Sequence, residues 1–331
     1  QQPAISADAH RTHAAAALVL LWLSAAVLAQ APSEAPPWRG SLPAEANRRF
    51  ATLVNQVTLM EFRGRFDQAV GLAEQALAIQ KQHLPASHVA LADSRRLINR
   101  LKTITKLPEP ARAELTSSVK WQLEGLGALR KNDAATALGR FGLILRATEK
   151  HLGSDHPATA RAADQIARLH VRAGRTADAL AFHQRARDIR RKSLGQHPLT
   201  AASEYETAFR MGELGRHLDA LTGFQAALQI LETGFGASDI NTAIARQGLA
   251  NCHANLGELA EAERLARRSV ADIAGLSGHD AVETTRARDG LALILRKRGR
   301  IASAQTLYEQ TLATRLAATS GPEPRPGFGP A

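Results

Sequence analysis

Residues 152–160 read LGSDHPATA, and residues 194–201 repeat most of this stretch as LGQHPLTA. Weaker copies follow at residues 235–243 (FGASDINTA) and 276–285 (LSGHDAVETT). One threonine of each copy can be aligned, at spacings of 41, 42 and 42 residues: Thr159, Thr200, Thr242 and Thr284. Four glycines have the same spacings: Gly174, Gly215, Gly257 and Gly299. A fixed period of this size indicates stacked structural repeats rather than one compact core.

Each repeat has the pattern of two helices. After the turn comes TARAADQIARLHVRAG (159–174), in which apolar residues recur at three- and four-residue spacing. Gly174 is placed to end this first helix because glycine tolerates positive φ. A second helix is expected over TADALAFHQRARDIRRKSLG (176–195). Small residues recur where the two helices must cross closely, in the first helix at Ala167, Ala208, Ala250 and Ala292. The pattern predicts an all-α fold, an α-α superhelix of antiparallel helix pairs.

The histidines of the opening stretch raise the question of a metal site. His151, Asp155 and His156 lie within six residues of one another. The third copy of the stretch has Ser238-Asp239 in place of the His-Pro pair, so the set does not recur with the repeat. Proline suits the first position of a helix, where no N–H partner is needed. We therefore predict that His156-Pro157 and His197-Pro198 form turns between one helix pair and the next, with no metal site and no cofactor.

Composition narrows the class of protein further. Only 4% of the 331 residues are aromatic, which favours close-packed helices over β-sandwiches. The single cysteine, Cys252, excludes an intrachain disulfide and a multi-cysteine zinc site. The formal net charge of +11 suits an anionic partner, although arginine is also a good residue for solvated helix surfaces.

The two ends of the sequence read differently from the repeats. Arg11 and His13 precede an uncharged run from residue 14 to residue 31, and small residues stand at a cleavage point before Gln30. This pattern predicts a signal peptide over residues 1–29, and hence an exported protein, periplasmic or secreted. An uncleaved membrane anchor is the alternative. Residues 30–43 read as a Pro-rich linker and residues 320–331 as a disordered tail.

The repeats resemble tetratricopeptide repeats of the 42-residue kinesin light chain type. In that family a His-Pro turn, a glycine between the helices and a small residue five positions later recur, as in residues 156–198. Two earlier units are weaker: residues 44–85 form one helix pair, and a second pair has Asn132 where glycine is usual. Residues 86–111 interrupt the register with an extra helix and a turn. We therefore expect six helix pairs and one inserted helix, with the main array over residues 112–319.

The resemblance implies a non-catalytic scaffold for protein–protein interaction, which binds a partner peptide or protein in the concave groove of the superhelix. The usual register of the family places the following residues in that groove: Arg161, Asp164, Arg168, Tyr205, Phe209, Gln247, Asn251, Asn255, Arg286 and Asp289. We expect Tyr205 and Phe209 to be an exposed aromatic pair, and the asparagines to bind a peptide backbone. Arg161/Asp164 and Arg286/Asp289 share an R-x-x-D spacing, which suits local ion pairs or ligand binding by the arginines.

The sequence also bears on functions other than a scaffold. The sequence has none of the common catalytic fingerprints, and Cys252 beside His253 falls on the inward side of its helix. An Arg-rich surface that binds anionic membrane is an alternative, and nucleic acid is a less suitable target for an exported chain. A role as accessory subunit of an envelope enzyme complex is also open. The charge favours an acidic partner, and the oligomeric state is not indicated.

Overall fold

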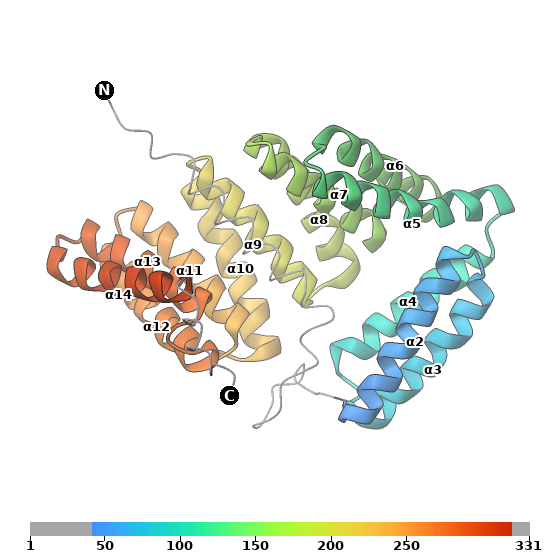
Figure 1. Cartoon of the computed structure of the whole chain (residues 1–331), viewed down its shortest axis with the longest axis horizontal. Helices are drawn as coiled ribbons and strands as arrows, with labels where there is room; N and C mark the ends of the chain where they lie inside the picture. The colour runs from blue at the N-terminus through green and yellow to red at the C-terminus, as the bar shows by residue number, and fades with distance from the viewer. Residues whose placement is uncertain (1–41, 320–331) are drawn as a thin grey trace, which may run out of the picture.

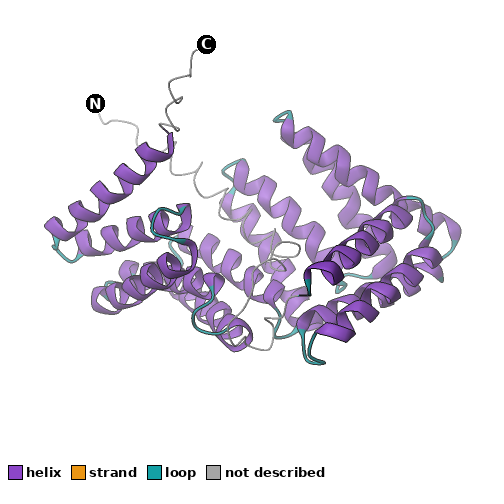
Figure 2. Cartoon of the chain, turned by 60° about the horizontal axis from the view of Figure 1, so that its bottom comes forward, coloured by secondary structure: helices purple, strands orange, loops and turns teal. Residues whose placement is uncertain are grey.

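The computed structural model describes residues 42–319, which form thirteen helices and no strand (Figures 1 and 2). The first six are α2 (Ala44–Phe62), α3 (Phe66–His83), α4 (Val89–Thr105), α5 (Glu109–Arg130), α6 (Ala134–Leu152) and α7 (Pro157–Arg172). The others are α8 (Thr176–Leu194), α9 (Pro198–Glu213), α10 (His217–Phe235), α11 (Ile240–Asn255), α12 (Leu259–Ser277), α13 (Val282–Lys297) and α14 (Ile301–Thr319). The predicted all-α superhelix is confirmed. The predicted signal peptide and tail, and residues 30–41 of the predicted linker, lie outside the described residues.

The repeated histidines start helices. The Nδ1 atom of His156 accepts a hydrogen bond of 3.1 Å from the backbone N–H of Ala158, which caps α7, and Pro157 follows at the first helical position. His197 caps α9 in the same way, at 3.1 Å from the N–H of Leu199. In the third copy the carboxylate of Asp239 accepts a hydrogen bond from the N–H of Asn241 and so caps α11. These side chains satisfy backbone donors that a helix start leaves free, so the predicted turn is confirmed.

The other members of the suspected metal set make separate contacts. The Nε2 atom of His151 lies 2.7 Å from a carboxylate oxygen of Glu114 on α5. Asp155 is ion-paired with Lys192 of α8. Within residues 42–319, no group of three or more His, Cys, Asp or Glu side chains is placed to hold a metal ion.

The chain reverses between paired helices through left-handed backbone. Gly174 has a φ of 71°, between α7 and α8. Asn132, in the same register between α5 and α6, has a φ of 59° and is the only described non-glycine residue with positive φ. Asparagine is the usual substitute for glycine in this conformation, so the expected role of Asn132 is confirmed.

Alanines allow the two helices of a pair to approach closely. Ala167, Ala208, Ala250 and Ala292 of the first helices have no exposed surface, and neither do Ala179, Ala220 and Ala262 of the second helices. Among the first helices, α11 also contacts both α9 and α13, whereas successive second helices make fewer contacts with one another. The stack is therefore curved, with the first helices on its inner side (Figure 1). We call this side the inner face.

The inserted helix α4 is a first helix that lacks its second helix. The Nδ1 atom of His88 accepts a hydrogen bond of 3.2 Å from the N–H of Ala90, just as His156 caps α7. Aligning these two histidines places Arg95 and Asn99 of α4 at the positions of Ala163 and Ala167. Both alanines are completely buried. Arg95 and Asn99 are instead exposed, because the chain turns directly into α5 and no second helix covers them.

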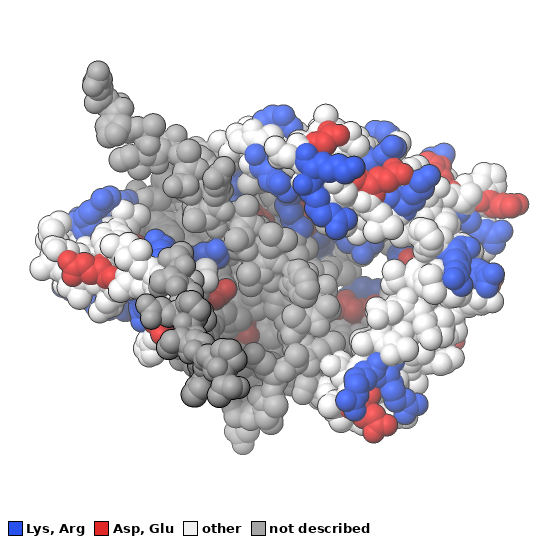
Figure 3. Space-filling model, in the orientation of Figure 1, with Lys and Arg blue, Asp and Glu red and all other residues white. Residues whose placement is uncertain are grey.

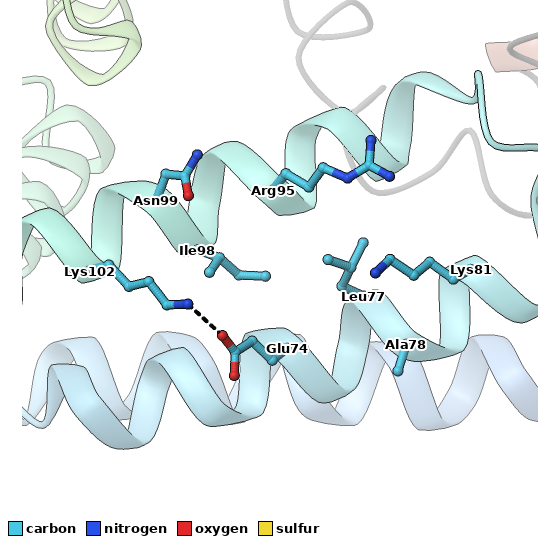
Figure 4. A pocket seen from close by; sticks show the side chains of 8 residues that line it. All are labelled: Glu74, Leu77, Ala78, Lys81, Arg95, Ile98, Asn99 and Lys102. Atoms are coloured by element: carbon cyan, nitrogen blue, oxygen red, sulfur yellow. Dashed lines mark ion pairs between the residues drawn. The ribbon is translucent and has the colours of Figure 1, made fainter.

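A pocket of about 360 Å³ marks the place of the missing helix (Figure 4). Leu77 of α3 and Ile98 of α4 lie between the two helices, while Lys102 forms a 2.7 Å ion pair with Glu74 at the edge. Polar side chains of α4, such as Arg95 and Asn99, therefore line the space where a complete repeat would have its second helix. Residues 86–111, predicted to be an insertion, therefore contain the first helix of a repeat. The main array, predicted to begin at residue 112, has its first helix α5 starting at Glu109, directly after Pro108.

Candidate functional site

The ten residues assigned to the groove lie on the first helices α7, α9, α11 and α13. Counted from the residue before each helix, they occupy the fifth, eighth, twelfth and sixteenth positions, which recur along one side of a helix. Because α11 contacts both α9 and α13, equivalent positions on these three helices form rows. The ten residues differ in how many of their hydrogen-bond donors, acceptors and charges are already paired within the protein.

Each of the two aspartates forms an ion pair within its own repeat. Asp164 is buried, pairs with Arg190 of α8 and lies 3.2 Å from Nδ1 of His183. Asp289 pairs with Arg315 of α14. The local pairs suggested by the R-x-x-D spacing are therefore wrong: each aspartate reaches the second helix, because that helix crosses its carboxylate. Neither aspartate is left as a free charge on the inner face.

The aromatic pair is less exposed than the sequence suggested. Tyr205 and Phe209 are half-buried, and their rings stack with centroids 6.3 Å apart. The edge of Tyr205 also meets the ring of Phe224 at 5.2 Å, and the guanidinium of Arg210 lies 4.4 Å from the centre of the Phe209 ring. Burial and the charge of Glu206 raise the pKa of the Tyr205 hydroxyl above its usual range. The prediction of an exposed pair is corrected: α10 covers one side of it.

The amide side chains of α11 form a partly linked row. Nε2 of Gln247 donates a hydrogen bond of 3.2 Å to Oδ1 of Asn251, which is exposed. Asn255 accepts a hydrogen bond of 2.8 Å from Nζ of Lys297 on α13. The Oε1 atom of Gln247 is buried and has no hydrogen-bond partner in the described chain. Asn251 and Gln247 therefore have hydrogen-bonding groups that are not paired with a described residue, whereas Asn255 already accepts a hydrogen bond from Lys297.

The arginines of the inner face are unpaired. Arg161, Arg168 and Arg286 make no hydrogen bond or ion pair with any other described residue. Arg161 is exposed, while Arg168 and Arg286 are half-buried. Every other half-buried or buried arginine between residues 42 and 319 has such a partner, for example Arg246, which pairs with Asp272 at 2.6 Å. Burial lowers the pKa of Arg168, against the opposing effect of the Asp164 and Glu206 carboxylates.

The basic residues of the outer surface are mostly paired. Figure 3 shows Lys and Arg side chains gathered over the part of the molecule where α5 to α8 lie. Acidic side chains accompany them: Arg140 pairs with Glu124 at 2.8 Å, Lys150 with Glu114 at 2.9 Å, and Arg185 with Glu149. This mixture favours a solvated surface over a uniform anion-binding patch.

The cysteine has no catalytic environment. Cys252 is buried in the core formed by α8 to α14, as predicted, and burial raises the pKa of its thiol to about 11. The adjacent His253 directs its Nδ1 atom to Glu258 and not to the sulfur. The thiol is therefore protonated at neutral pH, and a nucleophile needs the thiolate.

Family comparison agrees with this architecture. A model described as "Tetratricopeptide repeat" matches residues 123–192, 165–233, 208–272 and 248–317, and a second model with the same description matches residues 59–90. The chain belongs to the tetratricopeptide repeat family. The match to residues 59–90 covers the end of α2 and all of α3, and the four overlapping matches follow the register read from the glycines. Among the described residues of this tetratricopeptide repeat protein, no helix is long and apolar enough to span a membrane.

Solved structures with the same fold include proteins related to kinesin light chains. A putative kinesin light chain from Podosopora anserina, with nearly identical TPR-like repeats, has a TM-score of 0.55 at 20% identity and covers 65% of this chain and 100% of its own. BtubC (BKLC) from P. vanneervenii has a TM-score of 0.55 at 15% identity, over 87% of this chain and 98% of its own. At these identities the likeness shows the fold alone.

A curated relative matches part of the sequence. The clustered mitochondria protein homolog of Emericella nidulans is 31% identical over 114 residues. The matched part is 34% of this chain and 9% of that protein, so this chain spans only a small part of its relative.

Proposed function

We propose that the protein is a non-catalytic scaffold that binds a partner protein or peptide on the inner face of α7, α9, α11 and α13. The observation that carries this proposal is the pair of half-buried arginines, Arg168 and Arg286, that have no partner in the described chain. A guanidinium has five N–H donors and no acceptor, so a bound chain can supply the acceptors that the described residues do not offer to these two arginines.

The surroundings of the two arginines suit a peptide. Tyr205 and Phe209 of α9 lie on the same face, and their half-buried rings offer apolar area beside polar groups. Asn251 and Gln247 of α11 can hydrogen-bond to a peptide backbone. Because the unpaired groups are cationic, the partner should offer carboxylates or carbonyl oxygens to the inner face, which supports the expectation of an acidic partner.

The experiment uses the full chain and a random peptide library. We select binders by display and measure the affinity of the best peptide by calorimetry, for the wild type, Arg168→Gln and Arg286→Gln. Each substitution is expected to weaken binding about tenfold, because a hydrogen bond to a charged group is worth roughly 1.5–3 kcal/mol. The matched control is Arg296→Gln, which removes an exposed arginine of α13 and should leave the affinity unchanged.

Two results would contradict the proposal. One is a library that yields no specific binder. The other is a set of binders whose affinities are the same for wild type, Arg168→Gln and Arg286→Gln, because such peptides would dock elsewhere on the molecule.

We also propose that this scaffold acts outside the cytoplasm. The support is the sequence pattern before Gln30, which lies outside the described residues. Amino-terminal sequencing of the protein recovered from expressing bacteria should find Gln30 as the first residue in the exported fraction. A chain that keeps residues 1–29 and stays with the membrane would favour the anchor, and one that stays in the cytoplasm would contradict export.

A further inference from the structure

The pocket between α3 and α4 is lined by the same residue spacing on both helices. Each helix contributes four side chains at positions i, i+3, i+4 and i+7, from Glu74 to Lys81 on α3 and from Arg95 to Lys102 on α4. Residues at this spacing lie along one side of a helix. The pocket of about 360 Å³ therefore belongs to a groove that follows two turns of each helix, a length of about 10 Å. We call it the α3–α4 groove.

The floor of the α3–α4 groove is apolar, and one end of it is closed by an ion pair. Leu77 and Ile98 lie between the two helices (Figure 4). At one end Nζ of Lys102 pairs with the carboxylate of Glu74 at 2.7 Å. The two helices run antiparallel, so this pair sets which residues face each other along the groove.

The other end of the groove holds two positive charges. Seven residues further along α3 and seven residues back along α4, Lys81 and Arg95 lie at the same end, away from Glu74 (Figure 4). Both are exposed, and neither forms an ion pair or hydrogen bond with another residue of the described chain. Two like charges that face one groove without a counter-charge attract an anionic group. The groove thus offers a place for an anion beside an apolar floor.

A helix is the element that this repeat lacks at the groove. In the complete repeat of α7 and α8, Ala163 and Ala167 of the first helix are completely buried. The equivalent residues of α4 are Arg95 and Asn99, which are exposed in the groove. Two helices that present side chains at this spacing can receive a third between their rows. Because Arg95 and Asn99 are longer than alanine, the third helix must lie farther from α4 and offer polar groups to it.

We propose that the α3–α4 groove binds a short amphipathic helix of a partner protein, which takes the place of the missing second helix. A large apolar side chain of that helix packs on Leu77 and Ile98. An aspartate or glutamate one turn away pairs with Lys81 and Arg95. The charge of the groove decides the chemistry of the partner, because three cations and a single carboxylate line it.

This groove is distinct from the inner face. In the register of α7, the inner-face positions of α4 are occupied by Asp93, Arg96 and Arg100, and none of these lines the groove. The α3–α4 groove is therefore a second binding surface of the protein, and it does not depend on the peptide binding proposed for α7, α9, α11 and α13.

The test uses a displayed library of helical peptides as the probe. The peptides have an alanine framework about four turns long, and the residues of one face are randomised over two turns. Binders are selected on the full chain, and those that also bind Arg95→Gln are removed, which discards peptides that dock elsewhere. The remaining peptides are expected to carry an acidic residue one turn from a large apolar residue.

Two further readouts locate the best peptide. Lys81→Gln should weaken its binding about fivefold, the effect of losing one well-placed ion pair near the surface. The Cδ1 methyl signal of Ile98, assigned with Ile98→Val, should shift when the peptide binds. Arg63→Gln removes an exposed arginine between α2 and α3 and is the matched control, which should bind as wild type does. Lys81, Arg95 and Arg63 are all exposed, so their substitution leaves the core intact.

Four results would overturn the proposal. No peptide remains after the Arg95→Gln step, the remaining peptides lack an acidic residue, Lys81→Gln binds as tightly as wild type, or the Ile98 methyl signal does not move. The inner-face test is separate because it depends on Arg168 and Arg286. Arg168→Gln should leave the affinity of the selected peptide unchanged, so the two proposals can fail independently.

Discussion

Asp164 shows how one residue of the inner face is used for stability. Burial works to raise the pKa of its carboxyl, but the charge of Arg190 and the hydrogen bond to His183 outweigh burial and hold the pKa at about 2. A carboxylate with a pKa below its unfolded value stabilises the folded state at neutral pH. This contribution is lost as the pH falls from about 4 toward 2.

This predicts a pH-dependent cost of Asp164→Asn. At pH 7 the substitution leaves the buried Arg190 without its counter-charge, and we expect the free energy of unfolding to fall by about 3 kcal/mol. The difference from wild type should shrink when unfolding is measured at about pH 3, because wild-type Asp164 then begins to lose its charge on unfolding. Urea titrations followed by circular dichroism, at several pH values, measure both effects.

The matched control for this prediction is Asp188→Asn. Asp188 is exposed and pairs with its neighbour Arg187 on α8, so its loss should cost less than about 1 kcal/mol. If Asp164→Asn costs no more than this control at pH 7, the buried pair does not stabilise the fold.

At the scale of the element, α4 and α7 compare the same helix with and without a covering partner. Both start at a histidine cap, and both place an apolar isoleucine, Ile98 or Ile166, in a buried position. The difference lies in the side chains beside it: Ala167 is covered, whereas Asn99 is exposed at the pocket of Figure 4. The same helical register therefore carries different side chains according to whether a second helix packs there.

We predict opposite sensitivities at these equivalent positions. Ala167→Asn should destabilise the protein by about 3 kcal/mol, because it forces a larger, polar side chain into a close helix crossing. Asn99→Ala should change the free energy of unfolding by less than about 0.5 kcal/mol, since the surface is open. Urea unfolding of the two variants gives the comparison. A large loss with Asn99→Ala would show that the edge of α4 is packed in solution, contrary to the structure.

At the scale of the whole molecule, the protein is a curved stack with separate core regions. One core joins α2, α3 and α4 to α5 and α6, and another joins α8 to α14. Most helices pack between two sequence neighbours. Within the described residues α14 packs on α13 alone, and it leaves apolar side chains exposed: Ile301, Tyr308, Leu312 and Leu316. Stability in such a stack depends on nearest-neighbour contacts.

The stack predicts a gradient of protection. Hydrogen exchange measured by mass spectrometry should find the slowest amides in α10 and α11, which are covered on both sides, and faster exchange in α14, which opens by losing only one helix contact. Equal protection of α14 and α10 in the free protein would contradict the gradient, and would mean that another group covers the apolar side of α14.

Much of the architecture followed from sequence because each repeat is local. The positions of Gly174, Asn132 and the buried alanines depend on backbone conformation and helix crossing within some forty residues, and their spacing shows them directly. The same local spacing places the predicted groove residues on the first helices α7, α9, α11 and α13. The ion-pair partners of these residues could not be predicted from the sequence. The R-x-x-D spacing concerns one helix only, whereas Asp164 pairs with Arg190 of the neighbouring helix α8.

The repeat, its period and the helix pairs can be read from the sequence alone. These features follow from periodicities that the chain carries within each unit. The pairing of charges depends on the tertiary structure: Asp164 and Asp289 form ion pairs with second helices, the ring of Tyr205 is half-buried, and Arg161, Arg168 and Arg286 make no hydrogen bond or ion pair with another described residue. The tertiary structure alone also brings Asp93 to His197, 104 residues away along the chain. The physical reason is that ion pairing depends on distances between helices, and the curvature of the whole stack sets those distances.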